Sequence, residues 1–170
     1  MPRLHVCSLS RIEEVVNLTG ARKMVTLLSP GTKITRPSAI AVDDHLNLGV
    51  SDIVEPLQGQ VFPEAGHIDA LLVFVQRWDR VAPMLIHCYA GVSRSTASAF
   101  IAACALNPRR DEREIAQALR AASPTASPNP RFVALADSRL GREGRMSAAV
   151  LAIGRGADCF EAEPFALELA

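Results

Sequence analysis

The stretch that decides the fold is "MLIHCYAGVSRSTASAF", residues 84–100. Its apolar start lies in a strand that we predict over residues 83–88 and that ends at Cys88. Mostly small residues follow, and an Ala-rich helix is predicted for residues 94–106 because the run ends shortly before a proline. The stretch therefore predicts a buried strand and a helix joined by a short loop, with Cys88 and Arg94 at the two ends of that loop.

The rest of the chain alternates between strand and helix patterns. Short apolar or alternating runs predict strands, whereas apolar residues three and four apart predict helices. Further strands are predicted at residues 3–9, 23–29 and 45–50, and further helices at 10–20, 64–80, 111–123 and 131–141. This order indicates an α/β domain with a mainly parallel central sheet of about four to five strands flanked by helices.

Two predicted helices begin with capping signals. Towards the end of the chain the patterns that predict helices and strands become weak. Ser10 and Glu13 have the spacing of a capping box, and Asp111 precedes a helical pattern. From about Gly141 the periodicity fades into "GREGR" and "GRG". We therefore expect one domain over residues 1–140, followed by a C-terminal tail over residues 141–170 that is docked in part.

Composition limits the kinds of partner. The 170 residues carry a formal net charge of zero, 49% are hydrophobic and 21% are charged, which is typical of a globular domain. Because there is no basic excess, neither nucleic acid nor an anionic membrane is expected as a partner. No apolar run approaches membrane-spanning length and no secretory signal is evident, so the cytoplasm is the expected location. Nothing in the pattern indicates an oligomeric state.

The cysteines and histidines do not form a metal-binding or disulfide pattern. Cys7, Cys88, Cys104 and Cys159 lack CxxC spacing, and the four histidines are scattered. We therefore expect free thiols and neither a metal nor another cofactor.

The loop between strand and helix has the composition of an anion site. Its inward N–H groups would form a nest of donors, and the following helix adds the positive end of its dipole. Gly91 gives the backbone freedom, and the planar fork of Arg94 suits two oxygens of a phosphate. The expected binding residues are Tyr89, Ala90, Gly91, Val92, Ser93 and Arg94.

The same donors favour a negatively charged sulfur on Cys88. Cysteine pKa values at helix N-termini can fall to roughly 3.5–7.5, so we expect a thiolate at neutral pH. A thiolate beneath a bound phosphate can attack phosphorus and form a phosphocysteine. Ser95 is expected to donate to the sulfur as it leaves, and His87 to orient the cysteine or the loop.

"HCYAGVSRS" (87–95) resembles the signature of the cysteine-dependent protein tyrosine phosphatases: His-Cys, five residues, then Arg and Ser or Thr. The resemblance extends over roughly residues 45–140 and includes "SPTASPNPRF" (123–132). The chain resembles a small bacterial, dual-specificity-like tyrosine phosphatase. This resemblance implies a tyrosine phosphatase-like fold, a nucleophilic Cys88, an Arg94 that steadies the transition state, and a general acid on a separate loop.

The sequence offers two candidates for that acid. Asp52 follows the strand at residues 45–50, whose end should lie on the same side of the sheet as Cys88. Asp43 and Asp44 precede that strand and should point to the other side. Asp52 is therefore the predicted acid, with Glu55 as its nearest rival.

The predicted function is a metal-free phosphatase acting on a phosphotyrosine-containing protein or a small phosphomonoester. Phosphoserine and phosphothreonine are further candidate substrates. Two alternatives are a phosphoinositide or RNA 5′-phosphate phosphatase and a non-catalytic phosphoprotein-binding module. The loop holds no lysine, which argues against highly charged substrates, and the intact Cys88 and Arg94 argue against a module without turnover.

Overall fold

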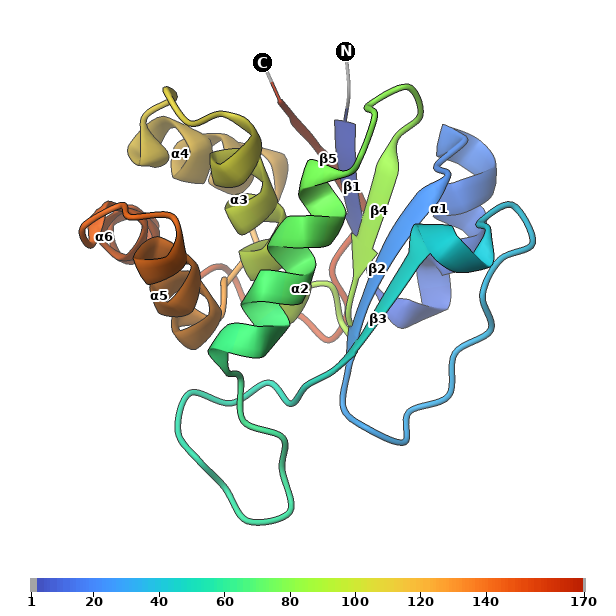
Figure 1. The fold of residues 1–170 in the computed structure, drawn as a ribbon, viewed down its shortest axis with the longest axis horizontal. Helices are drawn as coiled ribbons and strands as arrows, with labels where there is room; N and C mark the ends of the chain where they lie inside the picture. The colour runs from blue at the N-terminus through green and yellow to red at the C-terminus, as the bar shows by residue number, and fades with distance from the viewer. Residues whose placement is uncertain (1–2, 170) are drawn as a thin grey trace.

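Five strands form the sheet at the centre of the structure, a computed structural model that describes residues 3–169 (Figure 1). The strand order is β3-β2-β4-β1-β5, and β5 alone runs antiparallel to its neighbour. The strands are β1 (Arg3–Cys7), β2 (Lys23–Leu28), β3 (His45–Gly49), β4 (Met84–His87) and β5 (Phe165–Glu168). The predicted mainly parallel sheet of an α/β domain is confirmed.

The central strand β4 brings the cysteine to the carboxyl edge of the sheet. All four residues of β4 are buried, because strands pair with it on both sides and helices cover both faces. His87 pairs in register with Cys7 of β1 and with Thr26 of β2. Cys88 therefore lies just past the ends of parallel strands, where ligands bind in such sheets.

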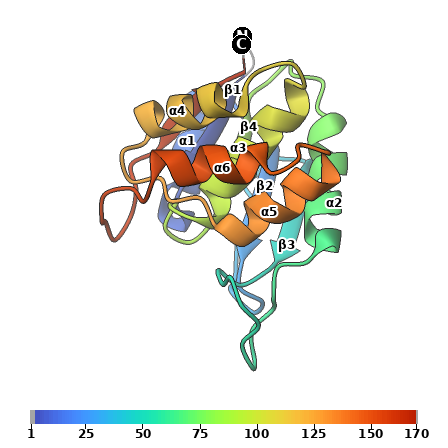
Figure 2. The same cartoon turned by 90° about the vertical axis from the view of Figure 1, so that its left-hand side faces the viewer.

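Helices cover the two faces of the sheet unequally. The helix α1 (Ile12–Thr19) packs on one face together with Met24 and Leu85. The other face is covered by α2 (Ala65–Gln76), α3 (Arg94–Leu106), α4 (Glu112–Ala122), α5 (Pro130–Arg139) and α6 (Arg145–Ile153). Figure 2 shows α6 and α5 as the outermost layer in front of α3. No helix within residues 3–169 combines the length and apolar character needed to cross a membrane.

The helix α3 is the core of the larger layer. Eleven of its 13 residues are buried, and it packs against α2, α4 and α5 as well as β1 and β4. Its alanines and serines are small enough to let these neighbours approach closely, while Phe100 and Ile101 are its largest fully buried side chains. Tight packing on all sides fixes the first turn of α3, which carries Arg94 and Ser95.

The two capping predictions had different outcomes. Asp111 caps α4, because its side chain accepts from the N–H of Arg113 at 2.7 Å. The capping box at Ser10 and Glu13 was wrong, since a 3-10 helix over Leu9–Arg11 precedes α1. The hydroxyl of Ser10 instead donates to Glu161, near the other end of the chain.

The C-terminal region contains elements that the sequence analysis missed. The helix α6 packs on α4 and α5, and its start is held by Asp137, whose carboxylate accepts from the N–H groups of Gly144 and Met146 at 2.7 Å. The strand β5 has only four residues and pairs with β1, Leu4 facing Leu167. Residues 141–169 are thus built into the same layers as the rest of the described chain.

Candidate active site

Cys88 and Arg94 lie at the two ends of a loop, residues 88–94, which we call the cup loop. Cys88 follows β4 directly, and Arg94 is the first residue of α3. Both side chains are buried, at 2% and 8% exposed. The predicted strand–loop–helix arrangement is therefore present.

The carbonyl groups of the cup loop point away from its centre. Four of them are bound from three segments of the chain: Tyr89 by the N–H of Leu9 (3.1 Å), Ala90 by that of Ala162 (2.9 Å), and Val92 and Ser93 by those of Ser127 (2.9 Å) and Asn129 (3.2 Å). In a trans peptide the N–H lies opposite the preceding C=O, so the N–H groups that follow these carbonyls face inward. None of the backbone N–H groups of residues 89–94 donates to an acceptor within residues 3–169. The loop thus presents a ring of free donors, which is a nest for an anion.

Gly91 is required by the position of the loop against β1. Its φ is +74°, and a Cβ atom there would lie 3.0 Å from the carbonyl carbon of Cys7 and 3.1 Å from the nitrogen of Ser8. Both are backbone atoms in a buried strand end, so they have little room to move. A side chain at this position would push the loop off the sheet and open the ring.

Only one side of the Arg94 guanidinium group forms hydrogen bonds with the described part of the protein. Its Nη1 donates to the carbonyl of Val50 at 3.0 Å and lies 3.4 Å from the hydroxyl of Ser29. Its Nε is buried and has no hydrogen-bond partner within the described residues. An unpaired buried donor is costly, so its retention beside the ring indicates a binding role for the Nε edge.

Ser95 is in direct contact with the cysteine. Its hydroxyl lies 3.0 Å from the Sγ of Cys88, and both groups are buried. A thiolate accepts hydrogen bonds but cannot donate, so Ser95 is the donor whenever Cys88 is ionised.

His87 supports the loop from behind the cysteine. Burial lowers its pKa from 6.5 to about 4, so the ring is neutral near pH 7. Its Nδ1 donates to the carbonyl of Cys88 at 3.1 Å, and its Nε2 lies 2.7 Å from the hydroxyl of Thr26. That hydroxyl also lies 2.7 Å from the Nε2 of His45. His87 thus contacts the backbone of the cup loop through a hydrogen bond, while its predicted role in orienting the cysteine or the loop stays a prediction.

Asp52 lies beside the cup loop. Its carboxylate accepts from the hydroxyl of Ser93 at 2.7 Å and from the Nδ2 of Asn129 at 2.8 Å. The side chain is exposed and lies on the loop between β3 and α2. A carboxyl group next to the cup and open to water is suited to proton transfer.

The other acidic candidates are placed differently. Glu55 is exposed further along the same loop and lines a surface pocket of about 370 Å³ together with Asp52. Asp44 forms an ion pair with Lys23 at 2.5 Å, at the amino end of β3. It therefore lies at the end of the strand away from Cys88, as does its neighbour Asp43.

Asn129 is the main site residue that the sequence analysis missed. Its side-chain oxygen caps α5 by accepting from the N–H of Arg131 at 2.9 Å, while its Nδ2 donates to Asp52. Asn followed by Pro130 is a typical helix start, so the cap could have been predicted. The second contact could not, because the two residues are 77 positions apart. Thr26, Ser29, His45 and Val50 were missed for the same reason.

The remaining cysteines do not contribute to the cup. Burial raises the pKa of Cys7 and of Cys104 to about 12, so both thiols are protonated at neutral pH. Cys159 is exposed, and all four cysteines are free. Within the part of the chain that the structure describes, no three His, Cys, Asp or Glu residues are grouped to hold a metal ion.

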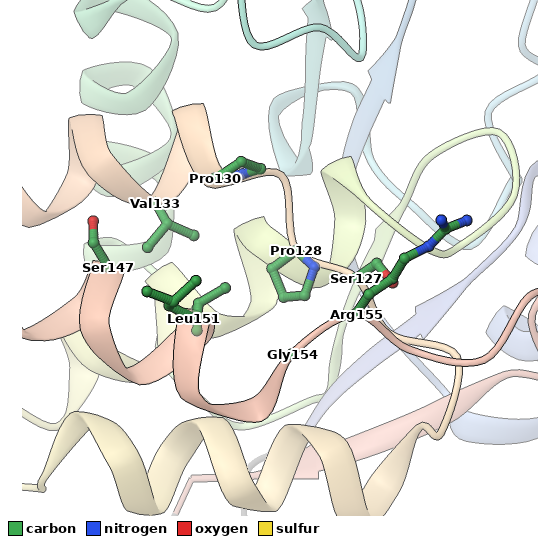
Figure 3. A pocket seen from close by; sticks show the side chains of 9 residues that line it. Ser127, Pro128, Pro130, Val133, Ser147, Leu151, Gly154 and Arg155 are labelled. Atoms are coloured by element: carbon green, nitrogen blue, oxygen red, sulfur yellow. The ribbon is translucent and has the colours of Figure 1, made fainter.

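An apolar groove lies on the other side of the segment that carries Asn129. Figure 3 shows it between α5 and α6, with Pro128, Val133 and Leu151 among the side chains that line it. Its volume is about 510 Å³, and neither Cys88 nor Arg94 lines it. The groove is therefore separate from the cup.

The structure is similar to several solved phosphatases. Human DUSP28 is 21% identical with a TM-score of 0.62, covering 82% of this chain and 92% of its own. DUSP15 is 17% identical with a TM-score of 0.62, covering 93% and 96%. The PTP-2 phosphatase of Cydia pomonella is 21% identical with a TM-score of 0.59, covering 79% and 84%. No family model matches the sequence, and no curated protein matches it. The chain has the fold of the cysteine-dependent tyrosine and dual-specificity phosphatases, which confirms the predicted fold class.

Proposed function

We propose that this protein is a metal-free phosphatase that hydrolyses phosphate monoesters through a phosphocysteine. The observation that carries the proposal is the cup loop, in which inward N–H groups and the unpaired Nε of Arg94 surround the position above Cys88. Such fixed donors neutralise an oxyanion without reorganising, which is the largest contribution to many enzyme rates. The charge of a bound phosphate is met by amides and a guanidinium, so the chemistry does not require a metal ion.

The reaction has two steps. In the first, the Cys88 thiolate attacks phosphorus, the S–P bond forms, the ester P–O bond breaks, and Asp52 gives its proton to the leaving oxygen. In the second, Asp52 takes a proton from a water molecule that attacks the phosphocysteine, and the S–P bond breaks. Ser95 donates to the sulfur as the thiolate is restored, and Arg94 steadies the phosphoryl oxygens in both steps.

Asp52 is a better acid for this role than Glu55. Two side chains hold its carboxylate, and one of them, Ser93, belongs to the cup loop itself. A general acid must lie within hydrogen-bond reach of the leaving oxygen, and geometry comes before pKa in choosing it. Glu55 stands further along an exposed loop.

The surroundings of the cup favour phosphotyrosine over polyanionic substrates. The cup loop carries no lysine, its own Tyr89 is exposed, and the exposed apolar side chains of Val54 and Leu57 line a surface pocket together with Ser93 of the loop. Phosphoinositides and RNA 5′-phosphates carry further negative charge that such a rim does not neutralise. A thiolate nucleophile must remain reduced, so we place the activity in a reducing compartment such as the cytoplasm.

The decisive experiment is hydrolysis of a small aryl phosphate in the presence of EDTA, followed by inhibition with vanadate. We expect turnover without added metal and inhibition that competes with substrate. Phosphotyrosine, phosphoserine and phosphothreonine peptides would then rank the substrates. Binding of phosphopeptides without any product release would instead support a non-catalytic module.

A further inference from the structure

Phe160 is the most exposed large apolar side chain in the described structure, and its whole surface is open to water. It lies in residues 154–164, the segment that joins α6 to β5. Tyr89, the first residue after Cys88, is 65% exposed. The two aromatic side chains line one surface pocket of about 320 Å³ together with Leu9, Ser10 and Glu161. We call this the aromatic pocket.

The segment that carries Phe160 is fixed at both ends. Before Phe160, the N–H of Gly156 donates to the hydroxyl of Ser127 at 2.9 Å, and the N–H of Ala157 donates to the carbonyl of Pro124 at 3.0 Å. After Phe160, the N–H of Ala162 donates to the carbonyl of Ala90 in the cup loop at 2.9 Å. Phe160 is therefore presented to solvent by an anchored backbone, which lowers the entropy cost of binding.

The neighbouring carboxylate is held as well. Glu161 accepts hydrogen bonds from the hydroxyl groups of Ser8 and Ser10, which ties the segment to the end of β1. Glu161 stays exposed and keeps its negative charge, so it and Ser10 form the polar part of the lining, while Leu9, Tyr89 and Phe160 supply the apolar walls. Such walls favour an apolar occupant and disfavour an acidic one.

We propose that the aromatic pocket binds an apolar side chain next to the phosphorylated residue of a substrate protein. This inference rests on the proposed function and specifies which substrates it prefers. One wall of the pocket is Tyr89 of the cup loop, the residue that follows Cys88, so the pocket lies beside the loop that would hold the phosphate. Phe160 and Tyr89 are the specificity-determining residues, because large aromatic surfaces bury much area with few rotatable bonds.

The test compares two phosphotyrosine peptides that differ only in the residues flanking phosphotyrosine, Leu in one and Ser in the other. We expect the wild-type enzyme to have a higher kcat/KM for the Leu-flanked peptide. Phe160→Ala should lower the ratio of the two kcat/KM values by about tenfold, a size usual for one apolar contact in a pocket. Phe160→Trp should retain the preference. The control is Val81→Ala, a highly exposed apolar residue (87%, against 103% for Phe160) that precedes β4 and so lies at the amino end of the sheet, away from Cys88.

The outcomes separate this inference from the proposed function. Hydrolysis of a small aryl phosphate by the wild type, without any preference between the two peptides, would overturn the aromatic pocket and leave the phosphatase intact. Equal ratios in Phe160→Ala and Val81→Ala would do the same. Absence of aryl phosphate hydrolysis would overturn the proposed function. In that case the dissociation constants of the two peptides, measured on Cys88→Ser, would still show whether the pocket selects apolar neighbours.

Discussion

The cup loop and the loop that carries Asp52, residues 51–63, are held in opposite ways. Three separate segments bind four carbonyls of the cup loop from outside, and its cysteine and arginine are buried. The Asp52 loop is mostly exposed, and two hydrogen bonds between Ser51 and Val61 close its base. The N–H of Ser51 donates to the carbonyl of Val61 at 3.0 Å, and the N–H of Val61 donates to the hydroxyl of Ser51 at 3.1 Å. Asp52 itself is held by the side chains of Ser93 and Asn129.

The difference matches what each loop must do. An oxyanion is stabilised only by donors that are already in place, so the cup loop needs a rigid backbone. In the proposed mechanism Asp52 acts first as an acid and then as a base and exchanges protons with water, so it would need solvent access together with a defined position. Changes in the cup loop should therefore be more damaging than changes in the Asp52 loop.

The largest effect is expected from Cys88→Ser. Because serine is a much weaker nucleophile than a thiolate, kcat for an aryl phosphate should fall at least about 1,000-fold. Inorganic phosphate should still bind, since the ring of N–H groups and Arg94 remain. Activity is read by steady-state kinetics and phosphate binding by calorimetry. Turnover near the wild-type rate would refute the phosphocysteine.

Arg94→Lys should have the next largest effect. An ammonium group cannot replace the two-pronged guanidinium, and loss of one such donor usually lowers kcat about 100- to 1,000-fold. Phosphate binding should weaken as well, unlike in Cys88→Ser. An unchanged affinity for phosphate would show that the Nε edge of Arg94 does not face the bound anion.

Asp52→Asn should lower kcat by about 100-fold. The size of the loss should depend on how much the leaving group needs a proton. An alkyl phosphate, whose alkoxide needs a proton, should suffer more than a nitrophenyl phosphate, whose anion leaves readily. Glu55→Gln is the matched control and should change both rates little. The reverse pattern would transfer the acid role to Glu55.

Asn129→Asp should lower kcat by about five- to tenfold through the position of Asp52. Aspartate can still cap α5, but it places a second carboxylate beside Asp52 and loses the bond to the carbonyl of Ile53, so the melting temperature should fall only modestly. It cannot donate to Asp52, so the contact of 2.8 Å is lost. A fall in melting temperature without a fall in kcat would show that Asn129 serves only the helix.

The smallest expected effect concerns the pH dependence of stability. The pKa of His87 is about 4 in the folded protein because of burial and 6.5 ordinarily. Between these values the unfolded chain binds a proton that the folded chain does not. The unfolding free energy should therefore fall by roughly 1 kcal/mol per pH unit as the pH drops from about 6.5 toward 4. Burial also lowers the pKa values of His5 and His45, so these two histidines also make the unfolding free energy fall as the pH drops.

Urea unfolding of the wild type and of His87→Asn at several pH values in this range measures the contribution of His87. The variant should lose less stability per pH unit than the wild type. Parallel curves would show that His87 takes up its proton without unfolding.

Some parts of the molecule could be predicted closely. The helix over residues 94–106 and the cap at Asp111 agree with the structure, because an Ala-rich run bounded by a proline and an Asp before an amphipathic run act through local geometry. The capping box at Ser10 failed because a distant carboxylate, Glu161, binds that hydroxyl instead. The strand β5 was missed because four residues carry too little periodicity to be recognised.

The sequence by itself determined the cup loop, since residues 87–95 are contiguous and strand, turn and helix follow from neighbouring residues. Tertiary structure alone decided which groups surround it. Asn129 reaches Asp52 across 77 positions, Thr26 reaches His87 across 61, and Ala162 reaches Ala90 from the far end of the chain. Such contacts depend on how the layers pack around β4 and α3, and no local preference of the backbone encodes them.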